Sequence, residues 1–167
     1  MLKYISAKKV ILKTLIRNYA MHNRRKPIKE LDPKAYEPMI ALEAYNKTCT
    51  INPLLKELIK MRASQINGCA YCLDMHSEDA LKLGESPRRI FALSVWHESH
   101  LFSEEERAIL QLTEEVTLIH EKGVSDETYQ KVVQLFGEKT TAQIIMLIVT
   151  INSWNRINVS TQNIYKE

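Results

Sequence analysis

Two thiols and an imidazole lie close together in the segment NGCAYCLDMHSEDALKLG, residues 67–84. Cys69 and Cys72 are three residues apart, and His76 follows four residues later. On a helix, this spacing places the three side chains on one face. The first turn of a helix stabilises a thiolate through its free N–H groups and dipole, and a nearby histidine can share the thiol proton. The pattern therefore indicates reactive dithiol chemistry.

Spacing alone leaves three interpretations open. A structural zinc site would use both thiolates and the imidazole, but no second Cys-x-x-Cys or His-x-x-x-His pattern supplies a fourth ligand. A thioredoxin-type site would need a strand before the helix, although the dithiol chemistry itself does not. Simple packing is the third interpretation, because free cysteines are among the most buried residue types. The histidine one turn after the second cysteine favours a functional site.

Glu57 precedes the two cysteines on a helix expected to begin at Pro53. It falls at the edge of the apolar stripe that contains Leu54 and Met61, so we expect a half-buried carboxylate near the thiols. Such a carboxylate is a candidate proton acceptor. A surface glutamate paired with Lys60, one turn further on, accounts for the pattern equally well.

Helix signals recur along the chain and predict the elements that position these residues. Asn52-Pro53 and Ser86-Pro87 each place a capping side chain before a proline at the first helical position, and Ser103 opens a capping box. Glycines number only four, and no Asn-Gly hairpin lies between alternating runs, which argues against a sheet. We predict an all-α fold of about seven helices, at residues 33–47, 53–66, 68–83, 87–98, 104–122, 126–136 and 139–157.

Length and composition predict one domain with its own core. The chain has 167 residues, of which 45% are hydrophobic. Three cysteines are an odd number, and we recognise no signal peptide, so a secreted disulfide framework is not expected. The longest apolar run, residues 142–151, is shorter than the ~20 residues of a membrane span and indicates a buried core helix. We expect a cytoplasmic protein in a reducing compartment.

Charge divides the chain into two parts. Residues 1–29 carry nine basic side chains and no acidic one, whereas the remainder carries 14 basic against 20 acidic side chains. The first part has apolar residues at helical spacing, so we predict a basic amphipathic arm at residues 1–29 and a helical domain at residues 30–167. We favour docking of the arm on the acidic domain over contact with a membrane surface. Nucleic-acid binding is not expected, because the basic charge is confined to the arm.

The segments around the dithiol resemble a known family. Glu57 with the Cys69-x-x-Cys72-x-x-x-His76 pattern is similar to the alkylhydroperoxidase D-like branch of the carboxymuconolactone decarboxylase family, as are EPMIALEAY, RRIFALSVWHESHLFSEEERAILQLTEEVT and INSWNRINV. The resemblance covers roughly residues 31–160 and leaves the arm outside. It implies an all-helical subunit that assembles into trimers or hexamers and carries a thiol-dependent peroxidase site.

The resemblance also implies a role for each residue of the site. Glu57 and His76 would form a proton relay, Cys72 would attack the peroxide, and Cys69 would resolve the sulfenic acid into a disulfide. No cofactor is expected, because the dithiol itself stores two electrons. The sequence departs from the better studied peroxidases at Tyr71, where they have a second histidine. Tyrosine, with an ordinary pKa of about 10, does not shuttle protons near neutral pH, which lowers the expected turnover.

Two functions follow from these expectations. The first is a peroxidase or dithiol-disulfide oxidoreductase that reduces small hydroperoxides with electrons from a thiol or dithiol donor. The alternative is a non-catalytic redox sensor or adaptor, a homo-oligomer whose disulfide alters assembly or partner binding. Only the first predicts turnover. Lactone decarboxylation is the less expected activity, because the branch that carries it typically lacks the dithiol.

Overall fold

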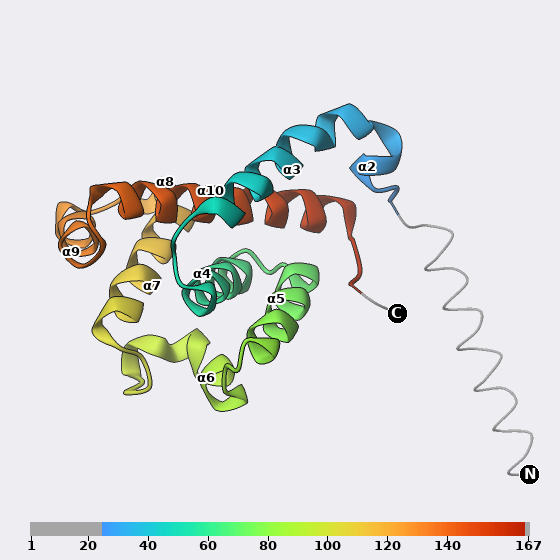
Figure 1. Ribbon diagram of the computed structural model, residues 1–167. Coiled ribbons are helices and arrows are strands. Elements are labelled where there is room, and N and C mark those ends of the chain that lie inside the picture. The colour runs from blue at the N-terminus through green and yellow to red at the C-terminus, as the bar shows by residue number, and fades with distance from the viewer. Residues whose placement is uncertain (1–24, 166–167) are drawn as a thin grey trace, which may run out of the picture.

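The computed structural model describes residues 25–165, so most of the predicted basic arm lies outside the described residues (Figure 1). Within this range every regular element is helical and there is no strand, which confirms the all-α prediction. In chain order the elements are α2 (Ile28–Leu31), α3 (Pro33–Thr48), α4 (Pro53–Ile66), α5 (Ala70–Lys82), α6 (Pro87–Ala92), the 3-10 helix η1 (Leu93–Glu98), α7 (Glu104–Thr117), α8 (Ile119–Lys122), α9 (Asp126–Phe136) and α10 (Glu138–Thr161).

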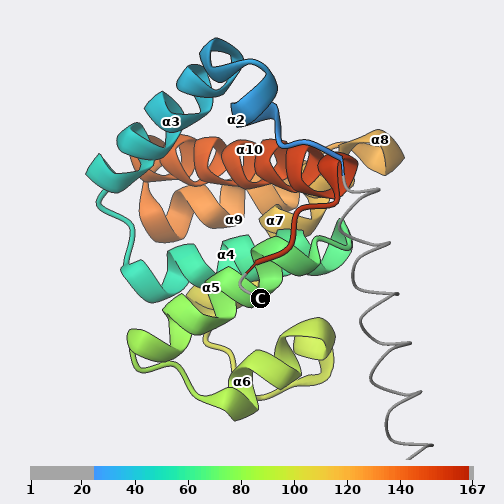
Figure 2. The same cartoon turned by 90° about the vertical axis from the view of Figure 1, so that its right-hand side faces the viewer.

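The core lies between α10 and the helices beneath it. α10 runs along one side of the molecule with α3 over its outer face, while α4 and α5 pack side by side on its inner face and α7 and α9 close one end (Figures 1 and 2). The predicted core helix at residues 142–151 is the middle of α10, and the fully buried side chains come mainly from α4, α7 and α10: Leu58, Ile59, Met61, Ile109, Leu110, Leu112, Ile144, Leu147 and Ile148. Burial of large apolar side chains is the main favourable term in folding.

No single helix among residues 25–165 is long and apolar enough to cross a membrane. α9 and α10 meet the length and composition requirement only as a pair, and they are bent by 119° at their junction.

Two predicted helices are interrupted in the structure. The segment 87–98 divides into α6 and η1, where Val95 has a non-helical φ of −125° and ψ of 32°. The tighter 3-10 turn brings side chains three residues apart onto one face, and Leu93 and Trp96 are both buried there. The segment 104–122 divides at Leu118, with φ −99° and ψ 33°, into α7 and α8. Helical periodicity alone does not reveal such breaks.

The turn between α4 and α5 holds the first cysteine in place. Gly68 has a φ of 65°, a left-handed conformation that glycine adopts without a steric cost. The N–H groups of Gly68 and Cys69 donate to the carbonyl oxygens of Gln65 (3.3 Å) and Ser64 (2.9 Å), which is the Schellman ending of α4. α5 therefore begins at Ala70 rather than at the predicted residue 68, and Cys69 becomes its N-cap.

Candidate active site

The two cysteines of the predicted dithiol form a disulfide at the N-terminus of α5. Cys69 and Cys72 have Cα atoms 5.4 Å apart, and the Cys72 N–H donates to Cys69 Sγ at 3.3 Å. This contact follows from the spacing, because the side chain of an N-cap residue folds back toward the third residue of its helix. Both residues are almost fully buried, at 2% and 1% exposed. The structure thus describes the oxidised state of the dithiol.

Glu57 on α4 and His76 on α5 face each other across the packed pair of helices. His76 Nδ1 lies 2.8 Å from Glu57 Oε2, and Lys60 Nζ donates to Glu57 Oε1 at 2.9 Å. Glu57 is 7% exposed and His76 is 6% exposed, so the carboxylate lies deeper than the half-buried position expected from helical periodicity. The sequence suggested either a carboxylate near the thiols or a glutamate paired with Lys60, and the structure shows both contacts. One carboxylate oxygen pairs with Lys60 and the other with the His76 imidazole.

The charge state of Glu57 determines how the imidazole is held. Burial raises the pKa of the Glu57 carboxyl group, but the hydrogen bonds and charges of His76 and Lys60 outweigh burial, and the pKa lies below its ordinary value. The group is thus an ionised carboxylate at neutral pH, which only accepts hydrogen bonds. His76 Nδ1 must then carry a proton to donate to this carboxylate, and in a neutral imidazole Nε2 is the nitrogen with the free lone pair.

We expect the free energy of unfolding to fall as the pH is lowered below about 5, where a glutamate carboxyl group with its ordinary pKa of 4.5 begins to bind protons. The pKa of Glu57 is lower in the folded chain than in the unfolded chain, so ionised Glu57 stabilises the fold above the unfolded pKa, and this contribution is lost as the pH falls through the folded pKa. Urea unfolding at several pH values measures this dependence. Glu57→Gln should make the free energy of unfolding depend less steeply on pH in this range. An unchanged slope in that variant would contradict the lowered pKa of Glu57.

A pocket of about 340 Å³ opens beside the disulfide, between α3, α4, α5 and α10. Cys72 and His76 both line it, whereas Cys69 does not. The rest of the lining combines three aromatic side chains, three aliphatic or thioether side chains, an asparagine and several charged groups: Tyr36, Ile40, Glu43, Lys47, Lys60, Tyr71, Met75, Asp79, Ile151, Trp154 and Asn158. The pocket therefore borders Cys72 rather than Cys69.

A row of asparagines on α10 lies against the dithiol turn, and sequence reasoning missed it. Asn67 Nδ2 donates to Oδ1 of Asn152 and of Asn155, each at 2.9 Å. One turn further along, Asn158 Nδ2 donates to Cys72 Sγ at 3.3 Å. The available signal was the three-residue spacing of these asparagines on a helix rich in buried apolar residues, because buried amides require hydrogen-bonding partners.

One group of three potential metal ligands occurs among the described residues. Ligand atoms of Glu57, His76 and Asp79 lie within 4.8 Å of one another. The Lys60 ammonium group already contacts one oxygen of Glu57, and it supplies the positive charge that a cation would bring. The two sulfur atoms are joined to each other, so they do not offer the two thiolate ligands of the zinc site considered from the sequence. Both oxygens of Glu57 are therefore already engaged, one by Lys60 and the other by His76.

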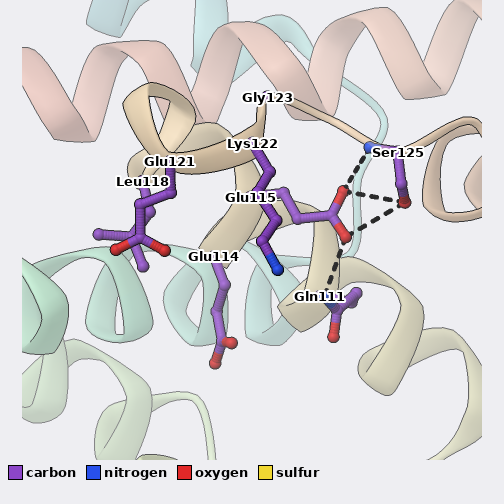
Figure 3. Close-up of a pocket in the computed structure, with 8 residues that line it drawn as sticks. All are labelled: Gln111, Glu114, Glu115, Leu118, Glu121, Lys122, Gly123 and Ser125. Carbon is purple, nitrogen blue, oxygen red and sulfur yellow. Dashed lines mark hydrogen bonds between the residues drawn. The ribbon is translucent and has the colours of Figure 1, made fainter.

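A second pocket, of about 320 Å³, lies where α7, α8 and the start of α9 meet (Figure 3). Glu115 accepts hydrogen bonds there from the N–H of Ser125 at 2.9 Å and from Gln111 Nε2 at 3.0 Å. The neighbouring Glu114 points in another direction and accepts from Arg62 Nε at 2.8 Å and Trp96 Nε1 at 2.6 Å. These carboxylates link helices to one another, so we assign them a structural role.

The fold and site define the class of protein: an all-helical domain with a disulfide-bonded cysteine pair at a helix N-terminus, beside a buried carboxylate–histidine pair. Residues 33–115 match the model of the carboxymuconolactone decarboxylase family. Together with the relatives described below, this match shows that the chain belongs to the carboxymuconolactone decarboxylase family. This confirms the resemblance to this family that the Glu57, Cys69, Cys72 and His76 pattern indicated.

Several similar proteins cover 80–87% of this chain. The uncharacterized protein YdfG of Bacillus subtilis (strain 168) is 44% identical over 134 residues, which are 80% of this chain and 91% of that protein. A protein of unknown function from Agrobacterium tumefaciens, described as a candidate antioxidant defence protein AhpD, has a TM-score of 0.84 at 35% identity and covers 87% of this chain and 99% of its own. The debrominase Bmp8 has a TM-score of 0.71 at 21% identity, covering 82% of this chain and 74% of its own, and this likeness concerns the fold alone.

Proposed function

We propose that the protein is a thiol-dependent peroxidase that reduces small hydroperoxides through Cys69 and Cys72. The observation that carries the proposal is the opening of Cys72 and His76 into one pocket, with His76 held by the buried carboxylate of Glu57. The disulfide supports it, because the two sulfur atoms are within bonding reach of each other. The likeness to a candidate antioxidant defence protein supports the same class of chemistry.

The proposed cycle balances as a two-electron reduction of the peroxide. The Cys72 thiol passes its proton to His76 Nε2, and the thiolate attacks the terminal oxygen of the hydroperoxide. The sulfur–oxygen bond forms as the oxygen–oxygen bond breaks, and the alcohol leaves with the proton from His76. The Cys69 thiol then attacks the Cys72 sulfenic acid, which forms the disulfide and releases water. An external thiol or dithiol reduces the disulfide and becomes a disulfide itself.

Tyr71 affects the proposed rate rather than the proposed reaction. Its ring lines the pocket and packs edge-on against Tyr165, with centroids 5.4 Å apart. A tyrosine hydroxyl can donate a hydrogen bond but holds its proton near neutral pH. We propose that proton transfer runs through His76 and Glu57 alone, and turnover should accordingly be slower than in peroxidases with a second relay histidine.

Assembly into a homo-oligomer is part of the proposal. Several large apolar side chains of the described domain are exposed, including Phe91 at 80% and Val95 at 59% on the α6–η1 segment. Contiguous exposed apolar side chains are typical of surfaces that pack against another protein. A trimer or hexamer would cover them.

The proposal is tested by counting thiols on fully reduced protein before and after one equivalent of tert-butyl hydroperoxide. Alkylation in denaturant, read by mass spectrometry, should fall from three thiols to one. The remaining thiol should be Cys49, which is buried and unpaired in the structure. Continuous peroxide consumption in the presence of excess dithiothreitol should accompany this loss.

The same samples distinguish the alternative function. Light scattering before and after oxidation reports the size of the oligomer. Disulfide formation without turnover, together with a change in oligomer size, would contradict the peroxidase and support a redox sensor or adaptor. Three thiols that survive peroxide treatment would contradict both functions.

A further inference from the structure

A polar contact from α10 reaches the sulfur atom that the proposed chemistry uses. Asn158 Nδ2 lies 3.3 Å from Cys72 Sγ, within the distance of a hydrogen bond to sulfur. Asn158 is only 6% exposed, so water competes little for its amide. A neutral or disulfide sulfur accepts hydrogen bonds weakly, whereas bonds to an ionised partner are about twice as strong. The contact therefore gains most when Cys72 is a thiolate.

The amide of Asn158 is oriented by the chain that follows α10. Asn163 Nδ2 donates to Asn158 Oδ1 at 2.7 Å, so the oxygen of the amide is occupied and the nitrogen faces the sulfur. Asn163 is returned to this position by Gln162, whose left-handed φ of 54° ends the helix. The N–H of Asn163 also donates to the carbonyl oxygen of Asn158 at 3.0 Å.

The segment after α10 is attached to α5 at a second place. The Tyr165 ring packs against Tyr71, which directly precedes Cys72. The Tyr165 hydroxyl donates to Glu78 Oε2 at 3.1 Å. In Figure 2 this segment passes from the end of α10 down across α5. The contacts on both sides of Asn163 hold it beside the dithiol.

Several titratable groups share the pocket with Cys72, and they come from three helices. They are Tyr36, Glu43 and Lys47 on α3, Lys60 on α4, and Tyr71, His76 and Asp79 on α5, with Glu57 bonded to His76. The lining residues from α10 are Ile151, Trp154 and Asn158, and none of these titrates. The polar group that α10 places against Cys72 is therefore the amide of Asn158. This amide is uncharged, so its effect on the thiol does not change with its own protonation.

We propose that Asn158 is a further catalytic residue that stabilises the Cys72 thiolate, and that Asn163 is a positioning residue that orients the Asn158 amide. The benefit to peroxide reduction rests on the proposed function. The stabilisation itself does not, because the acidity of the Cys72 thiol can be measured without any peroxide.

The test measures the pKa of Cys72 in full-length reduced protein that carries Cys69→Ser and Cys49→Ala, so that Cys72 is the only thiol. Thiolate absorbance and the rate of alkylation by iodoacetamide are followed against pH. Asn158→Ala should raise the thiol pKa by about one to two units, which is the effect of losing one hydrogen bond to a charged group. Asn158→Asp should raise it further, because a carboxylate would then face the sulfur.

The matched control is Asn155→Ala. Asn155 is buried one turn earlier on α10 and donates to Ser64 Oγ at 3.0 Å. This variant loses a buried amide in the same way, and we expect it to lower stability while leaving the thiol pKa at the parent value. Asn163→Ala, which changes a residue outside the helix, should raise the pKa by a smaller amount than Asn158→Ala. It also provides a second variant if Asn158→Ala does not fold.

The outcomes separate this proposal from the proposed peroxidase function. An unchanged thiol pKa in both Asn158→Ala and Asn163→Ala, or an equal shift in Asn155→Ala, would overturn the role of Asn158. Turnover is measured in the parent chain, which keeps all three cysteines. A raised thiol pKa in Asn158→Ala, with no hydroperoxide consumption by the parent chain, would support the role of Asn158 and reject the peroxidase. An unchanged thiol pKa in Asn158→Ala and Asn163→Ala, with normal turnover by the parent chain, would reject the role of Asn158 and support the peroxidase.

Discussion

Cys72→Ser is expected to reduce the rate of hydroperoxide consumption by roughly 10³-fold or more, because the variant lacks the attacking sulfur. A serine hydroxyl does not ionise near neutral pH and is not oxidised by a hydroperoxide. Cys72, rather than Cys69, lines the pocket with His76. The measurement is the disappearance of tert-butyl hydroperoxide with dithiothreitol as the electron donor.

Two cysteine variants make this prediction specific. Cys69→Ser should consume one equivalent of hydroperoxide and then stop at the Cys72 sulfenic acid, which a dimedone-type reagent traps. Serine is also a good N-cap, so the start of α5 should be preserved. Cys49→Ala changes a thiol outside the pocket and should retain the parent rate. Loss of the first equivalent in Cys69→Ser, with retention in Cys72→Ser, would assign the attack to Cys69 instead.

The second large effect is expected from Glu57→Gln, which should lower the peroxidase rate by about 10²–10⁴-fold. The amide has nearly the shape of the carboxylate but no charge, and its NH₂ group can donate to His76 Nδ1. The imidazole would then carry its proton on Nε2, where it could not accept the proton of the Cys72 thiol. The pH dependence of single-turnover disulfide formation reports this change directly.

Glu114→Gln is the control for the loss of a carboxylate that is hydrogen-bonded and partly buried. Glu114 accepts hydrogen bonds from Arg62 and Trp96, and its pKa is also lowered, because these bonds and that of His97 outweigh burial. It does not line the pocket beside Cys72. We expect a less stable protein with a nearly normal rate. A similar loss of rate in the two variants would attribute the Glu57→Gln effect to destabilisation rather than to proton transfer.

Helix starts are the part of the fold that local sequence signals determine. Asn52 accepts from the N–H of Leu54 at 2.9 Å, as the Asn-Pro pair predicts. Ser103 and Glu106 form both hydrogen bonds of the predicted capping box. These contacts join residues two or three positions apart, so their geometry depends on the local backbone alone. The helix breaks at Val95 and Leu118 were not predicted, because they depend on the packing of neighbouring side chains into the core and not on a local capping signal.

In the candidate site, too, contacts within one helix were predictable from the sequence, and contacts between helices were not. The sequence by itself determined that Cys72 and His76 share one face of a helix, because helical geometry sets the positions of residues four apart. Cys69 was predicted on the same face, but it lies just before α5 as the N-cap residue, with extended backbone. Only the tertiary structure decided that Glu57, 19 residues before His76, is buried against it. The same is true of Asn158, which lies 86 residues after Cys72. Such contacts depend on the packing of α4, α5 and α10, and this packing results from the fit of many side chains spread along the chain.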